Sequence, residues 1–174
     1  MLKQKQINRI EVIIDYQFQN TEKAFLWEAL QMTTPTQPSF DGRSTKGGNK
    51  KFAILGDAVM AVVVAEHWFS KKDSLTANWA QLHSARLSND YLKQVASKHN
   101  LVNYTERPPN GFGEKSAATL LEAIIGAVYL DSNRDMDAVR RAMIALGFSE
   151  VLNEPDHSTK LRDLVQEIRE ELER

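Results

Sequence analysis

The apolar positions of the chain recur at helical spacing along most of its length. Near the start, isoleucines lie three and four positions apart, which is the spacing of one helix face; they are Ile7, Ile10, Ile13 and Ile14. Residues 51–69 and 115–131 are apolar on nearly all sides, which is typical of helices buried in a core. Ser88 and Asn89 are typical of a helix start. The pattern therefore predicts an all-α fold in which the two apolar helices pack together.

Two polar segments interrupt this helical pattern. Residues 33–50 and 103–114 are rich in Pro, Gly, Ser or Asn, so we expect loops there. Near the end of the chain, apolar residues recur at helical spacing among charged ones, which predicts an amphipathic helix over residues 153–174. The expected organisation is one helical domain over residues 1–152, followed by this helix.

The composition excludes several classes of protein. The chain has 174 residues, of which 42% are hydrophobic, and this is enough for a substantial core. It has no cysteine, which excludes a disulfide scaffold, a thiol nucleophile and a zinc–thiolate site. That absence fits a reducing compartment, and we expect an intracellular protein, either cytoplasmic or mitochondrial. No run of 18 uninterrupted apolar residues occurs, so no membrane span is predicted.

The charges of the chain nearly balance, with 22 Lys and Arg against 23 Asp and Glu. A nucleic-acid-binding role would therefore need a local basic patch. One candidate follows Asp41, where four basic residues occur with no acid among them; they are Arg43, Lys46, Lys50 and Lys51. Contact with RNA phosphates is one role for these side chains, and a solvated loop is the alternative.

Two isolated acids, Asp57 and Glu122, stand in the two apolar helices. A carboxylate in an apolar setting is costly unless it has a partner, so two acids on packed helices could converge on one cation. A helix cap or an ordinary ion pair is the alternative role for each. Gly56 and Gly126 also lie in these helix interiors, where glycine is unfavourable by roughly 1 kcal/mol relative to alanine. Such a cost is tolerated where two backbones must approach closely.

Three motifs follow one another in the order and spacing of a known family. They are Leu55-Gly56-Asp57-Ala58-Val59, then Leu87-Ser88-Asn89 with Leu92, then the helical run from Glu122 to Asp131. In turn they resemble the signature helix, the Val-Ser-Asn segment and the second acidic helix of the ribonuclease III domain. The resemblance covers about residues 7–150. It implies an all-α, dimeric fold, and active members of this family cleave double-stranded RNA with a divalent metal.

The resemblance also assigns roles within the site. It makes Asp57 and Glu122 the catalytic and metal-binding residues, with Mg²⁺ or Mn²⁺ as the metal. Lys115 occupies a slot that is often lysine near the family's active site, which implies a contact with RNA. Most members carry two further acids, and here those slots hold Ala53 and Thr119. Because half of the usual carboxylates are missing, we expect the metal to bind weakly.

Two branches of the family fit this pattern at the acidic slots. The Mini-III branch resembles the chain in having Ala and Thr there, cleaves double-stranded RNA and lacks a separate double-stranded-RNA-binding domain, which we do not expect here either. Ribonuclease III-like proteins of the mitochondrial large ribosomal subunit, fungal ones especially, keep the fold and bind RNA without cleaving it. The N-terminal helices and the loop over residues 33–50 resemble this second branch more. The shared Ala and Thr do not separate the two branches. We expect a Mg²⁺-dependent endoribonuclease acting on double-stranded RNA, with a catalytically inactive RNA-binding protein as the alternative and a dimerisation scaffold without an RNA role as a third possibility.

The surface of the first apolar helix also predicts a homodimer. Its apolar residues, including Phe52 and Ile54, exceed what one small helical domain can bury. The family resemblance implies the same, and two sites related by a two-fold axis would each cut one strand.

Overall fold

The computed structural model describes residues 4–19, 23–32, 39–40, 43–44, 47–71, 75–105, 116–148 and 152. The helix expected over residues 153–174 lies outside the described residues, as do Lys46 and Lys115. The helices are α1 (Gln4–Ile13), α2 (Ala24–Ala29), α3 (Lys50–Ser70), α4 (Thr76–Leu87), α5 (Asn89–Lys98), α6 (Ser116–Asp131) and α7 (Met136–Met143). Shorter elements are the strands β1 (Ser39–Phe40) and β2 (Arg43–Ser44), the 3₁₀ turn η2 (Leu101–Tyr104) and the π-helical turn η3 (Ile144–Phe148). The predicted all-α fold is confirmed.

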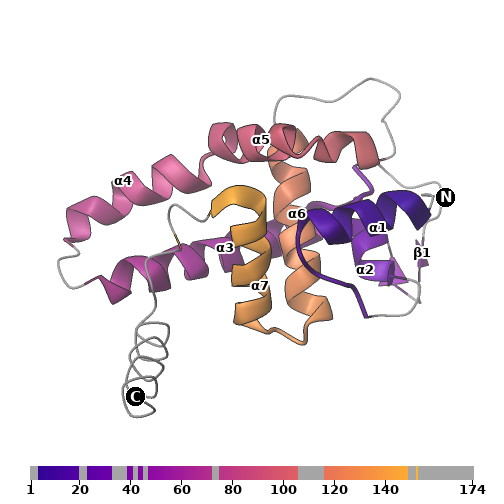
Figure 1. The fold of residues 1–174 in the computed structure, drawn as a ribbon, viewed down its shortest axis with the longest axis horizontal. Coiled ribbons are helices and arrows are strands. Elements are labelled where there is room, and N and C mark those ends of the chain that lie inside the picture. Colours follow the sequence, from indigo (N-terminus) through magenta and orange to yellow (C-terminus); the bar gives the residue numbers. More distant parts are fainter. Residues whose placement is uncertain are drawn as a thin grey trace, which may run out of the picture.

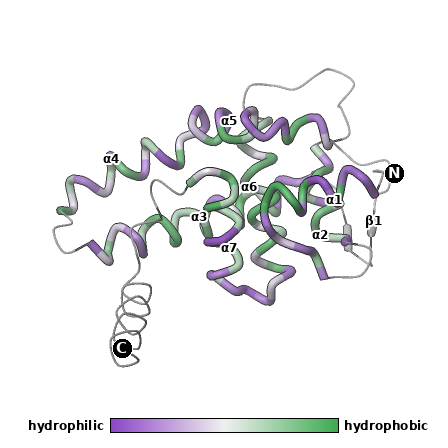
Figure 2. The backbone as a smooth tube through the Cα atoms, in the orientation of Figure 1, coloured by the Kyte–Doolittle hydropathy of each residue, from purple (hydrophilic) through white to green (hydrophobic). Residues whose placement is uncertain are grey.

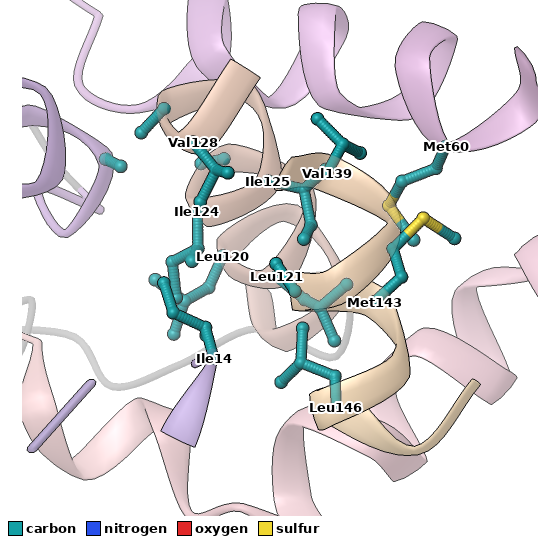
Figure 3. Close-up of a cluster of buried hydrophobic side chains, with 14 of the residues drawn as sticks. Ile14, Met60, Leu120, Leu121, Ile124, Ile125, Val128, Val139, Met143 and Leu146 are labelled. Carbon is teal, nitrogen blue, oxygen red and sulfur yellow. The ribbon is translucent and has the colours of Figure 1, made fainter. Parts of the chain in front are cut away.

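Helix α6 is the centre of the core. It contacts α2, α3, α5 and α7, so neighbours cover it on several sides (Figure 1). This explains why α6 is apolar almost all round, as Figure 2 shows along its length. Large side chains of α6 are completely buried and pack with Ile14, just after α1, and with residues of α3, α7 and η3 (Figure 3); they include Leu120, Leu121, Ile124 and Ile125. Burying each such side chain stabilises the fold by roughly 1.5–3 kcal/mol.

Helix α3 crosses α6, and their packing is the most extensive between any two helices that the structure describes. The predicted packing of the two apolar helices is therefore confirmed. Among the described helices, α3 is the one long and apolar enough to cross a membrane, judged by length and composition alone. Its place beside α6 in the protein core is a sufficient reason for that composition.

The start of α3 is tied to α2 by a buried asparagine. Asn49 precedes the helix, its side chain donates a hydrogen bond to the carbonyl of Ala29 at 3.1 Å, and its backbone N–H donates to the carbonyl of Gln31 at 2.8 Å. The Asn49 carbonyl in turn accepts from the N–H of Ala53 at 2.9 Å. One residue therefore satisfies backbone groups of both elements and fixes where α3 begins.

The sequence predicted a loop over the whole of residues 33–50, but the structure has two short strands within this segment. Strands β1 and β2 pair antiparallel, with Ser39 opposite Ser44 and Phe40 opposite Arg43. The prediction missed this hairpin because strands of two residues are too short for an alternating pattern.

The helix start predicted at Ser88 is confirmed. The Ser88 hydroxyl accepts a hydrogen bond from the backbone N–H of Tyr91 at 3.4 Å, which caps α5. Asp135 caps α7 in the same way, since its carboxylate accepts from the N–H of Asp137 at 2.8 Å.

Two buried or half-buried acids hold the link between α1 and α2. Glu11 accepts hydrogen bonds from the backbone N–H of Phe18 at 2.8 Å and from the ammonium of Lys23. Asp131, at the end of α6, accepts from the Tyr16 hydroxyl and the Gln19 N–H, both at 2.8 Å. Burial, followed by the bond to Asp131, raises the pKa of the Tyr16 phenol. These contacts anchor the N-terminal segment to the central helix.

Candidate active site

The two acids predicted from the sequence come from the two helices that cross. Asp57 projects from α3 and is exposed, whereas Glu122 projects from α6 and is half-buried. Burial, and after it the negative charge of Asp57, raise the pKa of Glu122 from its ordinary 4.5 to about 7. The structure therefore brings the two carboxyl groups within electrostatic reach of each other.

At two points of the crossing, α3 and α6 approach each other backbone to backbone. A Cβ atom added to Gly56 would lie 1.8 Å from the carbonyl oxygen of Glu122. A Cβ atom added to Gly126 would lie 2.2 Å from the carbonyl oxygen of Phe52. Both distances are far inside ordinary van der Waals contact, so only glycine fits at either position. The close approach predicted from the interior glycines is confirmed, and it occurs beside the two acids.

Ala53 and Thr119 stand one helical turn before Asp57 and Glu122, respectively, on the same helix faces. Ala53 is buried and Thr119 is half-buried. Neither supplies a negative charge. Among the described residues, no group of three or more His, Cys, Asp or Glu side chains could hold a metal ion.

The remaining donor set fits a hard divalent cation that keeps much of its water. Mg²⁺ commonly binds through one or two carboxylates and retains several waters. Asp57 and Glu122 supply two carboxyl groups on facing helices. A carboxyl group whose pKa is raised by burial and by another negative charge gains strongly from a nearby cation. Asp57 and Glu122 are therefore residues that could hold such a cation.

The predicted basic residues divide into two groups. Lys50 and Lys51 are exposed at the first turn of α3, two turns before Asp57. The backbone of Arg43 lies in β2, but its side chain is outside the described part of the chain, as are Lys46 and Lys115. The first turn of α3 contains no acid, so its two exposed lysines make this end of the helix positive.

One contributor to the site was not predicted from the sequence. Asn49 fixes the start of α3 by its bonds to Ala29 and Gln31, and so fixes where the helix presents Lys50 and Asp57. The only signal available was a polar residue before an apolar helix, which predicts an exposed cap. Instead the Asn49 side chain is buried and bonded to a different helix.

Comparison with known proteins agrees with this arrangement. Residues 50–133, which contain both acids, match the ribonuclease III domain. Ribonuclease 3 of Pseudomonas putida is 30% identical over 171 residues, covering 91% of this chain and 69% of that protein. Ribonuclease 3 of Caldanaerobacter subterraneus subsp. tengcongensis is 28% identical over 174 residues, covering 90% of this chain and 72% of that protein.

Solved structures show the same fold. The crystal structure of the nuclease domain of ribonuclease III from Campylobacter jejuni is 25% identical, with a TM-score of 0.65, and the match covers 87% of this chain and 99% of that one. A second structure of that domain, which concerns flexibility in the region of its dimer formation, is 24% identical, with a TM-score of 0.64. Fold and relatives together define the class as an all-α endoribonuclease of the ribonuclease III type. The chain belongs to the ribonuclease III family.

Proposed function

We propose that this protein is a Mg²⁺-dependent endoribonuclease that cleaves double-stranded RNA. The observation that carries the proposal is the pairing of Asp57 and Glu122 across the crossing of α3 and α6. Two carboxyl groups borne by helices in backbone contact can hold one cation. A cation there would offset the burial and the negative charge of Asp57 that raise the pKa of Glu122.

The residues of the chain would share the work at the scissile phosphate. Asp57 and Glu122 would hold the metal, which supplies a water of lowered pKa and offsets the charge of the phosphate. The Thr119 hydroxyl lies one turn before Glu122 and would form a hydrogen bond with a metal-bound water. Ala53 adds no charge, so the site rests on two carboxylates, and we expect activity to need Mg²⁺ in the millimolar range (order of magnitude).

Recognition of RNA would rest on local positive charge. The exposed Lys50 and Lys51 at the start of α3 would contact phosphates. Arg43, Lys46 and Lys115 are further candidates from the sequence. Because such contacts read phosphates and 2′-hydroxyls, recognition would depend on the A-form shape of the duplex and not on its sequence.

We also propose a homodimer formed through α3. Its face away from the core carries an apolar stripe, which is defined by Ile54, Ala58, Val62 and Phe69. Ile54 is 74% exposed and Phe69 is 82% exposed, so the chain itself does not cover them. Phe52, which the sequence analysis placed in this surface, is instead buried against Phe25, with ring centroids 5.9 Å apart. Asp57 adjoins the stripe, so a two-fold dimer would carry two sites, one for each RNA strand.

One observation favours a second function. Ala53 is buried and Thr119 is not acidic, so the family's fuller set of carboxylates is absent from their slots. A catalytically inactive RNA-binding protein on the same fold, comparable to a ribosomal component, would need no metal. It would use the same lysines and the same dimer surface.

A cleavage assay separates the two functions. Long double-stranded RNA is incubated with the full chain across Mg²⁺ and Mn²⁺ titrations, and binding is measured on the same RNA. We expect cleavage by the wild type and its loss in Asp57→Asn and Glu122→Gln, with RNA binding retained. Asp137→Asn, which removes an exposed acid on α7, is the matched control and should cleave normally. Binding without cleavage by the wild type would refute the enzyme and support the RNA-binding protein.

A further inference from the structure

The residue that touches the backbone of Glu122 is the neighbour of Asp57. The Cβ position of Gly56 would lie 1.8 Å from the carbonyl oxygen of Glu122 and 2.7 Å from its carbonyl carbon. The same position lies 2.9 Å from the backbone nitrogen of Gly126. The two segments that bear the acids are therefore in direct backbone contact, with no side chain between them.

Gly126 makes the reciprocal contact, which lies one turn later along α6 and one turn earlier along α3. Its Cβ position would lie 2.2 Å from the carbonyl oxygen of Phe52 and 3.0 Å from the backbone nitrogen of Gly56. Phe52 is itself buried, and Asn49 holds the first turn of α3 against α2. Neither helix can move away without disturbing these contacts, so the separation of the helices is fixed at the crossing.

We infer that Gly56 and Gly126 are positioning residues that set the spacing of the Asp57 and Glu122 carboxyl groups. The inference rests on the proposed function, because the spacing matters for holding one cation between two carboxylates. Asp has a short side chain and little freedom to compensate for a displaced backbone. Metal–oxygen distances of about 2.0–2.1 Å are required by Mg²⁺, and a displacement of about 1 Å can lower a rate about 100-fold.

An alanine at either glycine would push the helices apart. To restore ordinary contact at Gly126, α3 and α6 would have to separate by more than about 1 Å. That separation would move Glu122 away from Asp57, although both acidic side chains would still be present. A longer acid at position 57 would then reach further across the wider gap.

The test is a double-mutant cycle on the full chain with long double-stranded RNA and Mg²⁺. Gly126→Ala should lower kcat about 100-fold with little change in the KM for RNA. Asp57→Glu keeps the charge but adds one methylene, and it should lower kcat about tenfold or more. The double variant Gly126→Ala with Asp57→Glu should recover at least about tenfold of the activity that Gly126→Ala loses.

The matched control is Leu146→Ala, which opens a cavity under a completely buried side chain of η3. It should lower the melting temperature as Gly126→Ala does, while kcat per folded molecule stays within about threefold of the wild type. An equal loss of kcat in Leu146→Ala, or no recovery in the double variant, would overturn the inference.

Two further measurements keep the test decisive. Asp57→Glu changes an exposed residue, so this variant should fold even where Gly126→Ala does not. If the kcat of Asp57→Glu lies within about threefold of the wild type, the helices adjust freely to the longer side chain and the inference is overturned. If the wild type does not cleave RNA, the proposed function fails by itself. In that case crystal structures of the wild type and Gly126→Ala decide: we expect α3 and α6 to be further apart in the variant, and an unchanged separation refutes the positioning role.

Discussion

The two ends of α3 differ in how much of their surface the rest of the chain covers. Around Gly56, α3 meets α6 backbone to backbone. Toward Phe69 it runs beside α4, held there in part by the rings of Trp68 and Trp79, whose centroids lie 5.7 Å apart. In Figure 1 this second region, the arm formed by the end of α3 and by α4, extends to the left of the body.

The helices that accompany α3 in the two regions differ in the same way. Of the residues of α4, all of which the structure describes, Leu87 is the one that is buried. In α6 most residues from Leu120 to Val128 are buried. The crossing region therefore holds more of the buried core than the arm does. The uncovered apolar side chains of α3 form a stripe that begins at Ile54, close to the crossing, and reaches Phe69 in the arm. This is the arrangement expected of a surface that another molecule covers.

The largest expected difference between the two regions concerns stability. Leu121→Ala removes a completely buried side chain of α6, and we expect the free energy of unfolding to fall by about 2–5 kcal/mol. Leu75→Ala makes the same change at the start of α4, where the side chain is 66% exposed, and the expected change is within about 0.5 kcal/mol. Urea unfolding measures both. Comparable losses in the two variants would show that the arm belongs to the folding core.

A second prediction tests what covers the apolar stripe of α3. Ile54→Lys places a charge on the exposed stripe without touching the core, so we expect dimerisation to weaken at least about tenfold. The free energy of unfolding of the monomer should change by about 0.5 kcal/mol or less. Gln94→Lys, an equal change in charge at an exposed position of α5, is the control. Sedimentation measures the association, and a wild type that is monomeric at micromolar concentration would refute the dimer.

A third prediction concerns acidic side chains added at the crossing or in the arm. Ala53→Glu with Thr119→Asp adds two acids at the crossing, and we expect Mg²⁺ or Mn²⁺ to bind about tenfold tighter or more because the ligand charge doubles. Without metal the variant should be less stable than the wild type, since Ala53 is buried and a charge there lacks a partner. Thr76→Asp with Ala77→Glu adds the same acids at exposed positions of α4. Equal metal binding by both double variants would show that the crossing is not a metal site.

Much of the crossing could be predicted from the sequence. Glycine is unfavourable inside a helix and is tolerated there mainly where two backbones approach closely, so Gly56 and Gly126 indicated the contact that the structure shows. Two acids in otherwise apolar helices, Asp57 and Glu122, indicated that those helices share a polar site. Both signals are local, because the residue type is unusual for its immediate surroundings.

What could not be predicted depended on direction or on distant contacts. An all-round apolar helix gives no sign of which side faces the core, so Phe52 and Ile54 appeared equivalent although one is buried and the other exposed. The hydrogen bond between Tyr16 and Asp131 joins residues 115 positions apart, so no local sequence pattern could predict it. The role of Asn49 was not predicted because its partner, Ala29, lies on another helix.

The last and smallest expected effect is a pH dependence that belongs to the crossing. In the metal-free protein, burial and the charge of Asp57 raise the pKa of Glu122 from 4.5 to about 7. The folded pKa lies above the unfolded one, so the contribution of this group to stability is fully present below about pH 4.5 and is lost as the pH rises through about 7. Glu122 is partly exposed, and after allowance for solvent screening we expect a loss on the order of 1 kcal/mol.

Glu122→Gln is neutral throughout and should not show this loss. Thermal unfolding in a chelator between pH 4.5 and 7 should therefore give a steeper decline in stability for the wild type than for Glu122→Gln. Asp57→Asn removes the negative charge that is the second cause of the raised Glu122 pKa. It should reduce the loss of stability with rising pH less than Glu122→Gln does, because burial is the larger cause. Added Mg²⁺ should restore stability to the wild type near pH 7 and have little effect on Glu122→Gln. Parallel curves of stability against pH for the wild type and Glu122→Gln would mean that the Glu122 carboxyl is as well solvated as an exposed carboxyl of the arm. The crossing and the arm would then not differ in electrostatic environment.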